Sequence, residues 1–198
     1  SNVTKGYEWH EFINSNEPIE NPHQPKLSDL WTIIFTSGTT GNPKGVMLTY
    51  QAIDGIKVVL DDPNNPLGIK HTGNNDFISY LPLNHIFERV VIEWCSFRYG
   101  GTISFVESIE TFGQNLKEVQ PHVFAAAPRV WTKLQMGILS KFPQKKLDTL
   151  LKIPLFSTIL KKLIRKGLGF SRVRVTVSGS APMPVELIEW FRKVGVYI

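Results

Sequence analysis

The sequence predicts an α/β fold with a largely parallel sheet flanked by helices. Short apolar runs typical of strands alternate along the chain with longer stretches of helical periodicity. Strands that are separated by helices in this way indicate an α/β domain with a largely parallel sheet. The expected strands are 31–36, 77–81, 102–106, 122–126 and 173–178, and the expected helices are 49–60, 86–99, 112–119, 129–141 and 185–194.

Local signals mark the ends of the elements in the first half of the chain. An apolar run over residues 30–35 defines the first strand, and a glycine-rich loop follows it. Prolines, asparagines and a glycine at 63–68 indicate a surface loop rather than a domain boundary. The second strand ends at Leu81 because Pro82 interrupts it.

Similar signals mark the second half. Pro128 suits the first turn of the helix expected at 129–141, and Gly179 allows a tight turn after the last strand. Beyond helix 185–194, residues 196–198 read as a further strand just beginning. Because a domain rarely stops there, we expect the sequence to be part of a longer chain.

Composition excludes several classes of protein. The 198 residues are 42% hydrophobic and 20% charged, as in ordinary globular proteins. Cys95 is the single cysteine and there are five histidines, so neither a disulfide framework nor a structural zinc site is expected. The sequence contains no apolar run of about 18 residues and no signal peptide. These features predict a cytoplasmic location.

The net charge of +5 is unevenly distributed. Residues 133–166 contain nine basic residues and the single acid Asp148, so the rest of the chain is slightly acidic. Aromatic residues are not interleaved with these lysines, as a stacking platform for bases would require. We therefore expect no nucleic-acid partner.

Residues 36–45, TSGTTGNPKG, form the loop after the first expected strand. Glycines that let a ligand approach the backbone, hydroxyl donors and one lysine together suit phosphate oxygens. The hydroxyl donors are Thr36, Ser37, Thr39 and Thr40, the glycines are Gly38, Gly41 and Gly45, and the lysine is Lys44. A surface turn is the alternative. Pro43 and Gly45 depart from the Walker A pattern, which excludes an ordinary P-loop NTPase.

This string resembles the signature of the adenylate-forming superfamily, which comprises acyl-CoA synthetases, luciferases and the adenylation domains of peptide synthetases. The resemblance implies that the loop holds the β and γ phosphates of ATP while a substrate carboxylate attacks the α phosphorus. It also implies Mg²⁺, with Thr36 or Thr40 near the ion. Residues 1–198 would then be a partial N-terminal AMP-binding domain. The magnesium-binding glutamate, the ribose-binding aspartate and the C-terminal domain with its catalytic lysine would lie beyond Ile198.

The segment 79–89, SYLPLNHIFER, places His85 at the start of a helix. Such a histidine is commonly a hydrogen-bonded helix-terminal residue. The string LPLNHIFER resembles fatty acyl-CoA synthetases, which implies that His85 lies close to the acyl carboxylate and the adenylate as a catalytic, orienting group. Glu88 and Arg89 are expected to form a structural ion pair or helix caps.

The string APRVW ends at Trp131, for which two roles are open. A tryptophan on an amphipathic helix is ordinarily a core aromatic. The PRVW string, however, resembles the gate motif of long-chain fatty acyl-CoA synthetases. This resemblance implies that Trp131 swings to open a fatty-acid tunnel, and a gate should pack more loosely than a core residue.

Small residues follow the last expected strand in VSGSAPMP, residues 177–184. They leave room for a flat ring against the backbone, although a common strand-to-helix turn would look alike. The segment resembles the adenine-binding segment of the superfamily, which also borders the acyl pocket. The nucleotide-binding residues implied here are Gly179, Ser180, Ala181 and Pro182.

The basic segment 141–166 has two interpretations. Leucines and isoleucines recur at near-helical spacing with lysines between them, as in an amphipathic helix on a membrane surface. A solvated helix packed on the core gives much the same pattern. The first interpretation would add peripheral membrane contact to the cytoplasmic location.

Together these resemblances imply an enzyme that activates a long-chain fatty acid. ATP and the acid would give an acyl adenylate and pyrophosphate, and CoA would then displace AMP. Residues 1–198 alone are expected to be inactive. The alternatives are an adenylating enzyme for aryl or amino acids, a nonenzymatic nucleotide-binding or membrane-interaction module, and a phosphotransferase that releases ADP.

Overall fold

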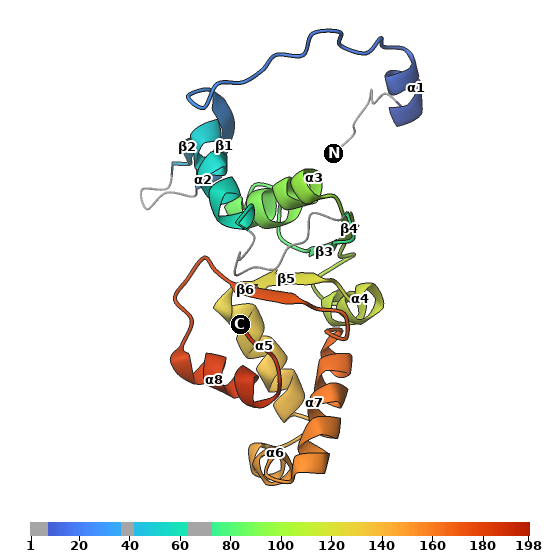
Figure 1. Cartoon of the computed structure of the whole chain (residues 1–198), viewed down its shortest axis with the longest axis vertical. Helices are drawn as coiled ribbons and strands as arrows, with labels where there is room; N and C mark the ends of the chain where they lie inside the picture. Colours follow the sequence, from blue (N-terminus) through green and yellow to red (C-terminus); the bar gives the residue numbers. More distant parts are fainter. Residues whose placement is uncertain (1–7, 37–41, 63–72) are drawn as a thin grey trace.

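The computed structural model describes residues 8–36, 42–62 and 73–198, and it confirms the α/β class. Four parallel strands form the central sheet in the order β4-β3-β5-β6 (Figure 1). Their bounds are Asp76–Ser79 for β3, Thr102–Phe105 for β4, Val123–Ala126 for β5 and Val175–Ser178 for β6. Each lies within one or two residues of a strand expected from the sequence, because a buried parallel strand reads as a short apolar run.

Helices follow the strands as expected, with three differences, the first being a helix at Trp9–Asn14 that the sequence did not predict. The helices are α1 (Trp9–Asn14), α2 (Tyr50–Leu60), η1 (Glu88–Trp94), α3 (Cys95–Tyr99), α4 (Phe112–Val119), α5 (Pro128–Leu139), α6 (Gln144–Leu151), α7 (Pro154–Leu168) and α8 (Val185–Lys193). The single helix expected at 86–99 begins as the π-helix η1 and continues as α3. The basic segment forms two helices because Pro154 starts a new one.

Apolar side chains pack against both faces of the sheet. Successive strand residues point to opposite faces, so Phe77 joins the cluster with Ile92 of η1, whereas Ile78 joins the cluster with Trp131 of α5. In Figure 1, α3 lies above the sheet and α5, α7 and α8 lie below it. No helix among the described residues is long and apolar enough to cross a membrane.

The first expected strand lies outside the parallel sheet. β1 (Leu30–Thr36) pairs antiparallel with β2 (Lys44–Thr49), and we call these two strands the hairpin. The expected loop therefore ends earlier than the sequence indicated, since Lys44 is already the first residue of β2. The β-prone residues Val46 to Thr49 account for this second strand, which the sequence reading missed.

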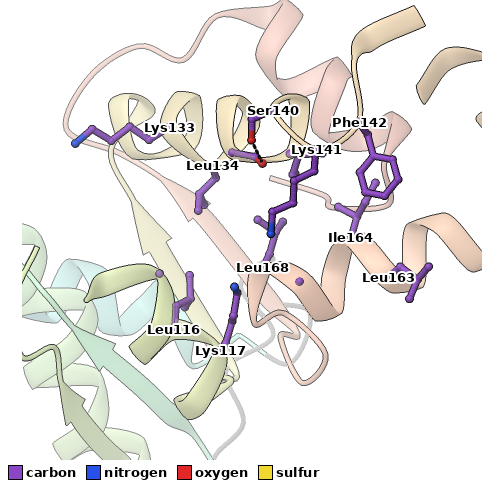
Figure 2. A pocket seen from close by; sticks show the side chains of 14 residues that line it. Leu116, Lys117, Lys133, Leu134, Ser140, Lys141, Phe142, Leu163, Ile164 and Leu168 are labelled. Carbon is purple, nitrogen blue, oxygen red and sulfur yellow. Dashed lines mark hydrogen bonds between the residues drawn. The ribbon is translucent and has the colours of Figure 1, made fainter. Parts of the chain in front are cut away.

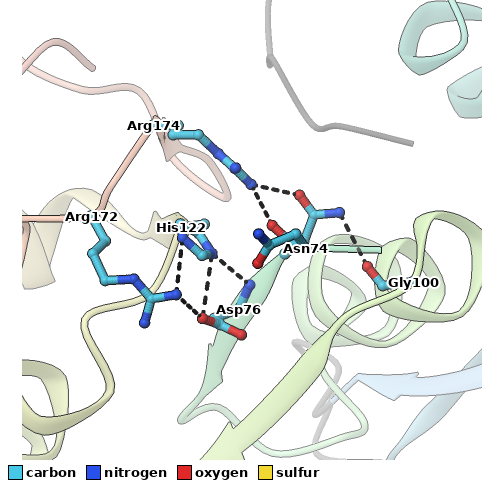
Figure 3. A network of polar contacts seen from close by, with 7 residues as sticks. Asn74, Asp76, Gly100, His122, Arg172 and Arg174 are labelled. Atoms are coloured by element: carbon cyan, nitrogen blue, oxygen red, sulfur yellow. Dashed lines mark hydrogen bonds and ion pairs between the residues drawn. The ribbon is translucent and has the colours of Figure 1, made fainter. Parts of the chain in front are cut away.

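A polar network joins the amino-terminal ends of β3, β5 and β6 (Figure 3). The backbone N–H of Asp76 donates to His122 Nδ1 at 3.1 Å, and the Asp76 carboxylate pairs with Arg172. Arg174 donates to Asn75 Oδ1 at 2.8 Å. These contacts fix the strands at the end of the sheet opposite the loops that carry the predicted site residues.

Candidate active site

The predicted site segments leave the sheet at its carboxyl-terminal edge. The loop with His85 follows β3, the helix with Trp131 follows β5, and Gly179 follows β6. In open α/β sheets, ligands bind in the crevice beyond the carboxyl ends of the strands. The topology therefore brings three of the four predicted motifs to the edge where a ligand is expected.

His85 lies in the turn that precedes η1. Its backbone N–H donates to the carbonyl of Pro82 at 2.9 Å, and its own carbonyl accepts from the amides of Glu88 and Arg89. The side-chain Nδ1 accepts from the N–H of Phe87 at 3.2 Å. A neutral imidazole that accepts at Nδ1 carries its proton on Nε2. The free end of His85 is thus a donor suited to a carboxylate or phosphate oxygen.

Glu88 lies in the protein interior beneath the loop of His85. Its side chain is fully buried, and Oε1 accepts from the backbone N–H of Tyr80 at 3.0 Å. Its other oxygen, Oε2, is buried without a hydrogen bond of normal geometry to any residue that the structure describes. Burial raises the pKa of the Glu88 carboxyl, opposed in part by the nearby Ser79 hydroxyl and backbone amides. Glu88 therefore ties the first turn of η1 to the end of β3.

The expected ion pair between Glu88 and Arg89 is wrong. Arg89 Nη1 lies 2.6 Å from both carboxylate oxygens of Glu93, one helical turn further along. Neighbouring residues on a helix point in different directions, whereas residues four apart meet, which explains the actual partner.

Arg89 also contacts β1, the strand that precedes the predicted phosphate loop. Its guanidinium lies 5.3 Å from the centre of the Trp31 ring, and Nη2 donates to Thr32 Oγ1 at 3.5 Å. Both partners belong to β1. Arg89 thus connects the loop of His85 to the strand that leads into TSGTTGNPKG.

Thr36 and Lys44 face each other where this hairpin opens. They are paired in register, and Thr36 Oγ1 donates to the Lys44 carbonyl at 3.5 Å. Both residues are exposed. The predicted nucleotide-binding residues Ser37, Gly38, Thr39, Thr40 and Gly41 lie outside the described residues.

Gly179 lies against the loop of His85. Its N–H donates to the carbonyl of Ala126 at 3.4 Å, and an added Cβ would come within 2.8 Å of the Phe87 ring. Any larger residue would therefore require the Phe87 ring to shift. Ser180 adopts a positive φ of 67°, and it is exposed together with Ala181 and Pro182. An exposed turn of small residues is compatible with a flat ring resting on the backbone.

Trp131 does not pack loosely, so this part of the sequence-based expectation is wrong. Its side chain is completely buried, and Nε1 donates to the Ala126 carbonyl at 3.2 Å. The rings of Phe124, Phe170 and Phe191 lie edge-on to it, with centroids 5.2, 6.0 and 5.1 Å away. This environment is that of a core aromatic, and the gate role stays a prediction.

No group of three His, Cys, Asp or Glu side chains that could hold a metal occurs within 8–36, 42–62 and 73–198. Thr36 and Thr40 were predicted to lie near Mg²⁺, and Thr40 is outside these ranges. The Thr36 hydroxyl is hydrogen-bonded at the mouth of the hairpin and could still contribute one oxygen ligand. The magnesium site therefore stays a prediction.

A family model described as AMP-binding enzyme matches residues 2–197, which is nearly the whole sequence. The chain belongs to this family. The match confirms the adenylate-forming resemblance seen in residues 36–45.

Long-chain acyl-CoA synthetases are prominent among the relatives of this AMP-binding chain. Long chain acyl-CoA synthetase 4 of Arabidopsis thaliana is 32% identical, over 95% of this chain and 31% of that protein. Long-chain-fatty-acid–CoA ligase 5 of Mus musculus is 33% identical, over 89% of this chain and 28% of that protein. The chain thus spans about 31% of the length of the first of these relatives.

Solved structures of adenylating proteins share the fold. The AMP complex of the A-PCP didomain of carboxylic acid reductase from Segniliparus rugosus has a TM-score of 0.64 and 23% identity, and it covers 91% of this chain and 24% of that one. ATP-bound MatB from Rhodopseudomonas palustris has a TM-score of 0.58 and 24% identity, over 87% of this chain and 29% of that one. At these identities the likeness shows a shared fold and nothing further.

Proposed function

We propose that the protein containing this chain activates a long-chain fatty acid, first as an acyl adenylate and then as its CoA thioester. The observation that carries the proposal is the identity of 31–33% to several long-chain acyl-CoA synthetases over most of the chain. The PRVW and LPLNHIFER strings, which resemble the same enzymes, support the choice of a fatty acid over an aryl or amino acid.

The described residues have separate roles in this proposal. Thr36 and Lys44 flank the loop that binds the β and γ phosphates, and the Lys44 charge favours the phosphate oxygens. His85 donates its Nε2–H to the oxygens of the substrate carboxylate or the adenylate and so orients the acid. The turn from Gly179 to Pro182 holds the adenine ring.

The reaction proceeds by two displacements. An oxygen of the fatty-acid carboxylate attacks the α phosphorus of ATP, and pyrophosphate leaves with the electron pair of the broken P–O bond. The CoA thiolate then attacks the acyl carbonyl carbon, and AMP leaves. Positioning and charge stabilisation supply most of the acceleration in such a transfer. Mg²⁺, when bound with ATP, would neutralise phosphate charge.

The intact protein tests this proposal by pyrophosphate exchange into ATP with a panel of acids. Palmitate is expected to support exchange strongly, whereas acetate, benzoate and an amino acid are expected to support little. Exchange dependent on benzoate or an amino acid instead would favour the other adenylating enzymes. Release of ADP rather than AMP would identify a phosphotransferase, and no exchange with any acid would favour a binding module.

Peripheral contact with a membrane is part of the same proposal, because long-chain fatty acids partition into membranes. The basic segment 141–166 supports it through its charge and its exposed apolar residues. A protein that draws its acid from a bilayer gains a shorter path for the substrate if this surface rests on the lipid.

A further inference from the structure

A groove between α4, α5 and α7 lies on the face of the protein below the sheet (Figure 2). It encloses about 350 Å³ and is lined mainly by apolar side chains from the three helices. They include Leu116, Leu134, Ile138, Phe142, Leu163 and Leu168. This volume lies at the lower end of ligand pockets, which span roughly 300–1,000 Å³, so the groove fits part of an extended chain.

Three glycines keep this groove open. Gly113, Gly137 and Gly167 line it from α4, α5 and α7, and a Cβ added to any of them would meet nothing within 4 Å. Glycine within a helix is less stable than alanine by roughly 1 kcal/mol. The packing of the fold does not require these glycines, because alanine would fit at each position. Their effect is to leave space between the helices.

Two lysines converge over the groove. In Figure 2, the side chains of Lys117 from α4 and Lys141 from the turn after α5 point toward each other. Neither forms an ion pair with any residue in the described part of the chain. The nearby carboxylate of Glu118 instead accepts a hydrogen bond from Gln114 at 2.8 Å. An apolar groove beneath two unpaired ammonium groups is complementary to an anionic head with an apolar tail.

The exposed face of α7 continues the apolar surface beyond the groove. Leu160, Ile164 and Leu168 are buried on one side of this helix. A second row remains exposed, with Leu155 at 70%, Phe156 at 53%, Ile159 at 49% and Leu163 at 56%. We call this row the α7 stripe. Leu163 also lines the groove, so stripe and groove form one surface, and helical spacing places Lys162 and Lys166 beside it.

We propose that the groove and the α7 stripe together dock the protein onto an anionic phospholipid bilayer. The lipid phosphate lies between Lys117 and Lys141, part of one acyl chain enters the groove, and the stripe rests in the interface between headgroups and chains. Helices α5 and α7 carry lysine or arginine but no acid, which matches the negative charge of such a surface. The inference deepens the membrane contact of the proposed function and rests on it.

Vesicle binding by the intact protein tests the proposal. Binding to phosphatidylcholine vesicles is compared with binding to vesicles that also contain phosphatidylserine, and the second is expected to be much tighter. Each lysine near an anionic surface contributes about fivefold in affinity, so Lys117→Ala with Lys141→Ala should weaken binding roughly 25-fold. Lys145→Ala with Lys146→Ala on α6 removes the same charge outside the groove and should weaken binding far less.

Apolar variants test the groove and the stripe separately. Gly137→Leu fills the groove, and Ile159→Ser with Leu163→Ser makes the stripe polar. Both are expected to reduce binding to anionic vesicles without lowering the melting temperature, since the altered side chains point away from the core. If a stripe variant instead melts well below the wild type, the stripe is covered by protein and the proposal is wrong.

Two further outcomes would overturn the inference. Equal losses in the groove and control lysine pairs would mean that net charge alone drives binding. Free palmitate could instead raise the melting temperature of the wild type but not that of the Lys117 and Lys141 variant, while the variant binds vesicles as tightly as the wild type. This result would make the groove a site for the free acid. Pyrophosphate exchange with a soluble medium-chain acid should be equal in all variants. Absence of exchange in the wild type would reject the proposed function, whereas a wild type that supports exchange but does not bind anionic vesicles would reject docking alone.

Discussion

Replacing Trp131 by alanine distinguishes a core residue from a gate. The side chain is fully buried, donates a hydrogen bond to Ala126 and contacts three phenylalanine rings. Truncating such a residue typically lowers the free energy of unfolding by about 3–5 kcal/mol. We expect Trp131→Ala to fall in this range, although the gate hypothesis drawn from the sequence predicts a clearly smaller loss.

Trp131→Phe is the matched control. It keeps an aromatic ring against the phenylalanines and removes the indole N–H. The Ala126 carbonyl still accepts from the Gly179 amide at 3.4 Å, so it does not become an unpaired buried acceptor. The expected loss is therefore about 1–2 kcal/mol.

Denaturant unfolding of the intact protein measures both losses, and fatty-acid kinetics are recorded on the same samples. If Trp131 is a core residue, its replacement by alanine should lower the free energy of unfolding and leave the chain-length profile for fatty acids unchanged. A loss below about 1 kcal/mol for Trp131→Ala, together with an altered Michaelis constant for fatty acids and an unaltered one for ATP, would refute the core assignment and restore the gate.

Four further predictions concern the site. His85→Asn should lower pyrophosphate exchange by about 10²-fold, because asparagine can replace the Nδ1 acceptor but not the Nε2–H donor; His85→Gln should retain more activity, and equal loss in both would contradict the donor role. Arg89→Lys should raise the Michaelis constant for ATP by roughly fivefold, since lysine cannot reproduce the contacts with Trp31, Thr32 and Glu93; an unchanged constant would separate Arg89 from the phosphate loop. Burial raises the pKa of Glu88 above its unfolded value, so its stabilising effect is full at low pH and is lost as the pH rises through the folded pKa; Glu88→Gln should flatten this fall in unfolding curves measured across pH, and parallel curves would argue against it. Finally, a protein limited to residues 1–198 should form no palmitoyl-CoA from palmitate, ATP and CoA, and measurable thioester by mass spectrometry would show that it suffices.

Much of the sheet could be predicted because each parallel strand is a short apolar run with a proline or glycine close to one of its ends: Pro82 after β3, Gly101 before β4, Pro128 after β5 and Gly179 after β6. The hairpin was harder to predict. Whether β1 pairs with β2 or joins the sheet depends on contacts between distant residues, which local patterns do not contain. The short apolar run after Lys44 lies between a glycine-rich loop and a helix. Its two ends were therefore assigned to the loop and to the helix, and no strand was predicted there.

The site was partly predictable for a similar reason. The position of His85 at a strand-to-helix turn and the turn at Gly179 follow from local residue types, whereas the close approach of Gly179 to Phe87 does not. Glu93 as the partner of Arg89 could have been found from the spacing of four along a helix. The burial of Glu88 could not have been predicted from the sequence, because it depends on where the end of β3 lies relative to η1. The tight packing of Trp131 also depends on residues distant in the sequence. A gate tryptophan and a core tryptophan give the same local sequence pattern, so the sequence could not distinguish them.

Under the proposed function, the first turn of η1 would couple the binding of ATP to the binding of the fatty acid. Within three residues, it contacts the turn at Gly179 through Phe87, the end of β3 through Glu88 and the hairpin through Arg89. Under the proposed function, a shift of this turn would change the surroundings of the nucleotide and of the acid at the same time. Thermodynamic linkage makes such an effect reciprocal: the factor by which ATP alters the affinity for the fatty acid equals the factor by which the fatty acid alters the affinity for ATP.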